Sequence, residues 1–184
     1  GAVYLQLHFL SLWDGYRAAS LLQWFASLGA GLALSVLIRR LLPRGTMGLP
    51  VLVGLTLPLG ILQASSSQTD LQVAAWLLIA IALMSRSTSD QTNSLGCAGL
   101  AFGLAVLTKP VAVLVGVPLA LLVLWKISRQ SSWAAAARAG LITVALGILI
   151  CAPHFGRNQS TFGDPLGSSA GTLLEERSAA DLVA

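Results

Sequence analysis

Six side chains stand out in this sequence as candidates for chemistry. They are Gln68, Asp70, Lys109, His154, Arg157 and Asn158. A carboxylate can take a proton from a reacting hydroxyl group, and Lys and Arg side chains can stabilise the negative charge of a phosphate. The set therefore indicates a reaction at a phosphorylated compound.

Asp70 closes the polar stretch SSSQTD, which separates two apolar segments. One interpretation is a helix N-cap, in which Asp, Ser or Thr accepts hydrogen bonds from free backbone N–H groups and complements the positive helix end. The other is a carboxylate that binds a cation or a reacting hydroxyl, because ionisable groups next to apolar surroundings are costly and tend to be functional. The two roles are compatible.

Lys109 and Arg157 each have an ordinary and a functional interpretation. Lys109 could extend its ammonium to lipid headgroups, or it could bind an anionic ligand. Pro110, which follows it, favours a fixed helix break at this point. Arg157 lies in PHFGRN, which could be a plain interfacial loop, or the planar guanidinium could hold a phosphate through two hydrogen bonds at once.

The composition is that of an integral membrane protein. Of 184 residues, 55% are hydrophobic and only 10% are charged, with a mean hydropathy of +0.79, whereas soluble domains are about 25% charged. The apolar runs are far longer than the roughly 10-residue strands of outer-membrane barrels, so helices are the expected spanning elements. The sequence contains no P-loop, dinucleotide-binding glycine pattern or Cys/His zinc spacing, which excludes those classes of soluble enzyme.

We therefore predict an all-α fold, a polytopic transmembrane helix bundle with about six crossings. The apolar runs are residues 18–38, 46–64, 71–84, 95–125 and 133–151. As one helix, the run 95–125 would be roughly 46 Å long, too long for a hydrocarbon core of about 30 Å. We divide it at Lys109 and Pro110 into two crossings.

The distribution of cations predicts the orientation of this bundle. If RRLLPRG lies on one side, seven of the eleven Lys and Arg residues fall on that side and four on the other. The positive-inside rule makes the seven-cation side cytoplasmic. Asp70, Lys109 and Arg157 then lie on the outer side of the membrane.

Three stretches, in this order, resemble the membrane core of bacterial family 39 glycosyltransferases, which are dolichyl-phosphate-mannose protein mannosyltransferase-like enzymes of the GT-C superfamily. The stretches are LPLGILQASSSQTDLQVAAWLL, GLAFGLAVLTKPVAVLVGVPLALL and APHFGRNQSTFGDPLG. They contain a Gln-x-Asp that opens a helix, a Gly-rich helix that ends in Leu-Thr-Lys, and an Arg-Asn followed by Phe-Gly-x-Pro-Leu-Gly. The resemblance covers residues 5–167.

The resemblance implies an enzyme of a bacterial inner membrane. This enzyme takes a sugar from a polyprenyl-phosphate donor in the membrane and passes it, with inversion, to an acceptor on the outer, periplasmic face. The acceptor would be a lipid, a glycan or a protein. It implies that Asp70 is a catalytic carboxylate, near which a divalent cation such as Mg²⁺ or Mn²⁺ can bind. It also implies that Lys109 and Arg157 hold the donor phosphate. The remaining expected substrate-binding residues are Gln68, His154 and Asn158.

The N-terminal part departs from the family pattern. The principal catalytic carboxylate of the family lies in a first outer loop after a first transmembrane helix, and the setting of Asp14, the only acid in this part of the chain, does not match it. We therefore expect a fragment. Residues 1–167 would be an N-terminally truncated transmembrane core, and residues 168–184 a polar outer-face segment that leads to a missing C-terminal part.

Two further functions remain open on the sequence alone. A transporter or flippase for a lipid-linked or anionic substrate would also use broken helices and a cation, but it needs polar groups near the middle of the bilayer. The polar groups here gather at the outer mouth instead, which favours the glycosyltransferase. The third possibility is a non-catalytic membrane subunit. The expected partners are the lipid bilayer, the donor and the acceptor, with no nucleic acid.

Overall fold

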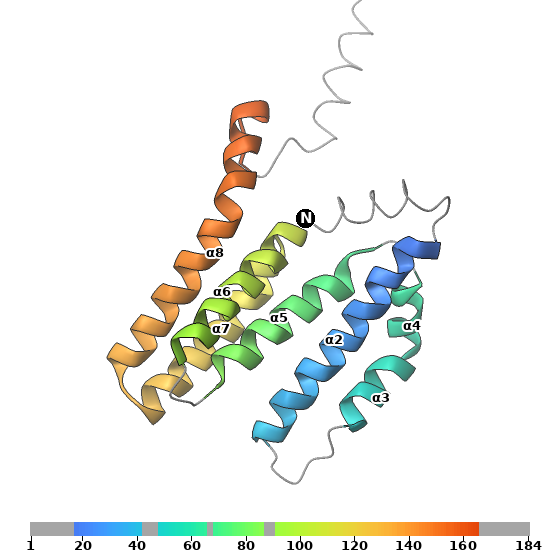
Figure 1. Ribbon diagram of the computed structural model, residues 1–184, viewed down its shortest axis with the longest axis horizontal. Coiled ribbons are helices and arrows are strands. Elements are labelled where there is room, and N and C mark those ends of the chain that lie inside the picture. Colours follow the sequence, from blue (N-terminus) through green and yellow to red (C-terminus); the bar gives the residue numbers. More distant parts are fainter. Residues whose placement is uncertain (1–16, 42–47, 66–67, 87–90, 166–184) are drawn as a thin grey trace, which may run out of the picture. The chain divides into compact units, whose positions relative to one another are not determined.

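The computed structural model describes residues 17–41, 48–65, 68–86 and 91–165 (Figure 1). The regular structure of these residues consists of seven helices and no strands. The helices are α2 (Arg17–Leu41), α3 (Gly48–Thr56), α4 (Pro58–Ala64), α5 (Asp70–Met84), α6 (Gln91–Thr108), α7 (Ala112–Gln130) and α8 (Trp133–Phe162). The prediction of an all-α fold is confirmed. Asp14 and the predicted segment 168–184 lie outside the described residues.

The surfaces of these helices suit a lipid environment. Three helices are long and apolar enough to cross a membrane, and two apolar helices are shorter. The long ones are Ser20–Arg40, Ala112–Gln130 and Trp133–Phe162, and the short ones are Asp70–Met84 and Asn93–Thr108. Large apolar side chains point outward, and Phe25, Leu114 and Leu141 are each more than 70% exposed. Lipid tails are as apolar as these side chains, so the exposure carries no penalty in a membrane.

The chain divides into two units, Gly1–Ile150 and Cys151–Ala184, which we describe separately. In the first unit α5 lies between α2 and α6, and α3 and α4 pack against α2 (Figure 1). The buried residues of α5 are mostly small and medium apolar side chains such as Ala75, Ala80 and Met84. Small residues let neighbouring helices approach closely, so α5 forms the centre of this unit.

The predicted crossing 46–64 is broken into the two short helices α3 and α4. Leu57, between them, has an extended conformation with φ −62° and ψ 124°, and Pro58 is the first residue of α4. Proline has no N–H to donate, its ring clashes with the carbonyl four residues earlier, and it disfavours a helical conformation in the residue before it. The segment predicted as one crossing therefore contains a break at Leu57 and Pro58.

The run 95–125 is divided at the predicted place. Helix α6 ends at Thr108 and α7 begins at Ala112. In the turn between them, the N–H of Ala112 donates to the carbonyl of Lys109 at 2.9 Å. Pro110 cannot donate to α6, so the helix stops and the chain reverses.

Glycines of α6 bring this helix against the first part of α8. A Cβ atom on Gly99 would lie 2.6 Å from the carbonyl oxygen of Thr143, and one on Gly103 would lie 3.1 Å from the carbonyl oxygen of Gly147. Only a residue without a Cβ atom permits such a close approach between two backbones.

Helix α8 extends past the predicted end at residue 151. It continues to Phe162, so PHFGRN is helical and not a loop. Pro153 falls inside the helix, where it removes one backbone hydrogen bond without ending it. The helix ends at Gly163, whose φ of +71° suits glycine at this position.

Candidate active site at the start of α5 and the end of α6

An ion pair joins the N-terminus of α5 to the turn after α6. The Nζ atom of Lys109 donates to the Oδ1 atom of Asp70. The side chain of Lys109 is 37% exposed and that of Asp70 is 42% exposed. The pair is therefore open to an incoming ligand, while its backbone positions are fixed by two helices.

Asp70 is the first residue of α5 and not its N-cap. The cap position belongs to Thr69, whose side chain makes no capping hydrogen bond, although its carbonyl accepts from the N–H of Val73 at 3.1 Å. A carboxylate in the first turn complements the positive end of the helix dipole.

Lys109 is held by the backbone on both sides. Its N–H donates to the carbonyl of Ala105 at 3.0 Å, and its carbonyl accepts from Ala112. The side chain therefore starts from a fixed point at the end of α6. It contacts the Asp70 carboxylate, and binding of an anionic ligand by Lys109 stays a prediction.

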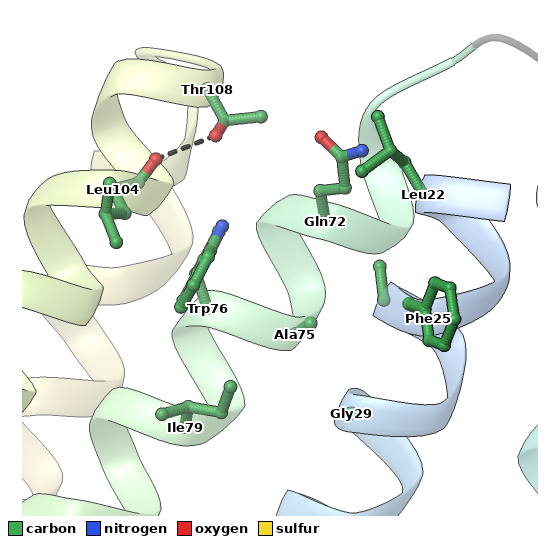
Figure 2. Close-up of a pocket in the computed structure, with 10 residues that line it drawn as sticks. Leu22, Phe25, Gly29, Gln72, Ala75, Trp76, Ile79, Leu104 and Thr108 are labelled. Carbon is green, nitrogen blue, oxygen red and sulfur yellow. Dashed lines mark hydrogen bonds between the residues drawn. The ribbon is translucent and has the colours of Figure 1, made fainter. Parts of the chain in front are cut away.

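An apolar cavity of about 360 Å³ lies between α2, α5 and α6 (Figure 2). Its size is typical of small-molecule sites, which range from about 300 to 1,000 Å³. The lining residues are Leu22, Phe25, Ala26, Gly29, Gln72, Ala75, Trp76, Ile79, Leu104 and Thr108. Apart from Gln72, Thr108 and the indole N–H of Trp76, this lining consists of hydrocarbon.

The polar end of the cavity adjoins the ion pair along the chain. Thr108 directly precedes Lys109, and Gln72 follows Asp70 by two residues. Figure 2 shows Gln72 and Thr108 on the same side of the cavity, with Gly29 and Ile79 further along the helices. The hydroxyl of Thr108 donates to the carbonyl of Leu104 at 2.7 Å. A ligand with a polar head and a hydrocarbon tail matches this arrangement.

Sequence reasoning missed Gln72, Trp76 and Thr108, whose side chains bring polar atoms to the lining of this cavity. Gln72 is buried although it lies in an apolar helix. Gln72 and Trp76 are four residues apart and so share one face of α5. That spacing does not distinguish a face that lines a cavity from any other buried face.

The other predicted site residues lie in different places. Gln68 is exposed and precedes α5 by two residues. His154, Arg157 and Asn158 belong to the second unit, in the last turns of α8, where a spacing of three and four residues puts them on one helix face. The Nδ2 atom of Asn158 lies 3.5 Å from Nε2 of His154 and donates to the carbonyl of Pro165 at 3.2 Å.

A divalent cation near Asp70 stays a prediction. Among the residues that the structure describes, no three His, Cys, Asp or Glu side chains gather into a group that could hold a metal, and the described partner of the Asp70 carboxylate is the ammonium group of Lys109. Mg²⁺ is commonly held by one or two carboxylates together with substrate phosphates, so Asp70 would supply one such ligand.

Comparison with known proteins gives a family match for this chain. The model of the dolichyl-phosphate-mannose-protein mannosyltransferase family matches residues 2–156, which is most of the chain. No curated protein and no solved structure matches it. With this match over an all-α membrane bundle, the chain belongs to the dolichyl-phosphate-mannose-protein mannosyltransferase family of membrane glycosyltransferases.

Proposed function

We propose that this protein moves a sugar from a polyprenyl-phosphate-linked donor to an acceptor on the outer face of the membrane. The observation that carries the proposal is the Asp70–Lys109 ion pair beside the polar end of an apolar cavity. The cavity suits the first isoprene units of the donor, and the ion pair suits its phosphate and the reacting hydroxyl group.

Lys109 is proposed to hold the donor phosphate. An ammonium group has three N–H donors, and one of them serves Asp70. The other two can bind phosphate oxygens and stabilise the negative charge that the leaving phosphate gains in the transition state. Arg157 remains a second proposed phosphate contact, with Gln68, His154 and Asn158 as proposed substrate-binding residues, all supported by the sequence motifs.

Asp70 is proposed to act as the base. The acceptor oxygen attacks the anomeric carbon from the side opposite the phosphate, and its proton passes to the Asp70 carboxylate. The bond between the anomeric carbon and the phosphate oxygen breaks, and its electron pair stays on the phosphate. Attack from the opposite side inverts the configuration of the sugar.

Binding of radiolabelled dolichyl-phosphate-mannose to the purified protein in detergent tests this proposal. We expect Lys109→Gln to weaken binding about tenfold or more, because a hydrogen bond to a charged group contributes about 1.5–3 kcal/mol. Lys126→Gln is the matched control. Lys126 is exposed near the end of α7, does not line the cavity of Figure 2 and is not part of the Asp70–Lys109 ion pair. Equal binding by the wild type and Lys109→Gln would overturn the assignment of the phosphate to Lys109.

A further inference from the structure

A second apolar cavity, of about 530 Å³, continues along the seam between α2 and α5. Gly29 and Ile79 line both cavities, so the second one extends away from the Asp70–Lys109 end. We call it the α2–α5 groove. Its lining residues are Gly29, Leu32, Ala33, Val36, Arg40, Ile79, Ala82, Leu83 and Arg86.

The lining follows one face of each helix. On α2 the spacing is three, one, three and four residues up to Arg40, and on α5 it is three, one and three residues up to Arg86. Such spacing keeps side chains on one side of a helix. All of these residues are apolar except the two arginines, so the groove is a hydrocarbon trough that ends in two guanidinium groups.

Arg40 is held at the end of the groove by a hydrogen bond. Its Nη1 atom donates to the carbonyl of Ala82, which is among the last four residues of α5. The last carbonyls of a helix lack partners within the helix, and here the N–H of Arg86 goes to the carbonyl of Leu83 at 3.2 Å. Arg40 therefore caps α5, and its guanidinium retains further N–H groups with which an anion can bond.

The described lining of the groove ends in two positive charges. Arg86 lies close enough to Arg40 for the two charges to repel each other, and no acidic residue is among the described residues that line the groove. An anion between the two guanidinium groups would relieve this repulsion. Arginine is well matched to phosphate because its planar group donates two hydrogen bonds at once.

We propose that the α2–α5 groove binds an anionic phospholipid, with one acyl chain in the trough and the phosphate between Arg40 and Arg86. The length supports this occupant. The 11 helical steps from Gly29 to Arg40 span roughly 16 Å, close to half of a hydrocarbon core of about 30 Å. The trough is therefore as deep as one leaflet, whereas a further transmembrane helix would cover the whole seam. Basic pockets between helices are known to hold anionic headgroups.

Native mass spectrometry of the purified protein tests the proposal by titration with phosphatidylglycerol and with phosphatidylcholine of the same chain length. We expect phosphatidylglycerol to bind the wild type about tenfold more tightly, and the double variant Arg40→Gln/Arg86→Gln to lose that preference, because both charged hydrogen-bond partners are removed. The control is Lys126→Gln/Arg129→Gln, which removes two exposed cations of α7 and should change the affinity less than twofold.

A second variant separates lipid binding from loss of the α5 cap. Val36→Phe fills the trough and leaves both arginines in place, so it should also weaken phosphatidylglycerol binding about tenfold. Unchanged binding by Val36→Phe would mean that the arginines attract the phosphate group while no acyl chain lies in the trough. Displacement of the lipid by millimolar inorganic phosphate would also mean that the acyl chain does not contribute to binding. Equal binding of the two lipids by the wild type would show that the groove does not select a charge. Each of these results would overturn the proposal.

Discussion

The Asp70–Lys109 ion pair contributes little to the stability of this protein. Both side chains are more than one third exposed, and exposed ion pairs are worth about 0–1 kcal/mol. Ionisable groups at the edge of a membrane are nevertheless costly to keep there. The pair brings a carboxylate and an ammonium together from two helices and yet stabilises the fold little. We propose that its role is to bind a ligand.

Asp70→Asn should separate catalysis from folding. The amide keeps the size of the side chain but cannot accept the proton of the acceptor hydroxyl, so we expect sugar transfer to fall by roughly 10²- to 10⁴-fold. The midpoint of thermal unfolding in detergent should change little, since the ion pair is weak. Binding of dolichyl-phosphate-mannose should be retained, because Lys109 remains.

The result that would contradict this assignment is transfer at the wild-type rate by Asp70→Asn. Asp70 would then act only through the helix dipole, as a first-turn carboxylate. A matched change at Asp164, which is exposed in the turn after α8, provides the control, and Asp164→Asn should leave both stability and donor binding unchanged.

Part of the site could be predicted from the sequence at the residue level. Asp70 and Lys109 were recognisable because charged residues beside long apolar runs are unusual, and the structure brings these two together. Gln72, Trp76 and Thr108 were not recognisable in the same way, since a cavity depends on how three helices pack, and a glutamine or threonine in a helix has no distinctive pattern of its own.

At the level of helices, sequence reasoning predicted the helix break that follows from the length of an apolar run. It missed the helix boundaries that depend on local backbone geometry. The run 95–125 was too long for one crossing, and its break at Lys109 and Pro110 is confirmed. The run 46–64 has the length of one crossing, so the break at Leu57 and Pro58 was missed. In α8 the opposite occurred, because Pro153 and the polar residues after it suggested an end that the helix passes.

The contact between α6 and α8 within the first unit provides a test of the packing. Gly99→Ala would place a Cβ atom 2.6 Å from the carbonyl oxygen and 3.1 Å from the Cα atom of Thr143. Backbone atoms cannot move aside as a side chain can, so the two helices must separate. We expect a loss of about 1–3 kcal/mol of unfolding free energy, measured as a lower midpoint of thermal unfolding in detergent.

Gly54→Ala is the control for that experiment. A Cβ atom on Gly54 would have no neighbour within 4 Å, and alanine favours a helix over glycine by about 0.8–1 kcal/mol. The midpoint of Gly54→Ala should therefore equal or exceed that of the wild type. If Gly99→Ala behaved in the same way, the close contact between α6 and α8 would be refuted.

At the level of the whole molecule, the uneven distribution of charge predicts how the bundle sits in the membrane. The count of seven cations against four predicts that the chain after α4 lies outside and the chain between α7 and α8 lies inside. Ser65 and Ser131 are exposed residues in these two places. The topology can therefore be tested with single cysteines at the two positions.

Ser65→Cys and Ser131→Cys should react differently with a membrane-impermeant maleimide. In a background that lacks the native Cys97 and Cys151, we expect Ser65→Cys to be labelled in sealed right-side-out vesicles. Ser131→Cys should be labelled only after the vesicles are permeabilised. The reverse pattern would invert the topology and place the Asp70–Lys109 pair on the cytoplasmic side.

The ion pair also has a consequence for soluble anions. Asp70 offsets the charge of Lys109, so this pair by itself presents no net charge to the water outside. Long-range attraction of soluble anions depends on a net charge and is screened beyond about 8 Å at physiological ionic strength. We therefore expect the pair to attract inorganic phosphate, nucleotides and free sugar phosphates only weakly. A phosphate on a hydrocarbon chain would arrive through the membrane instead, and its contact with Lys109 would not depend on long-range attraction.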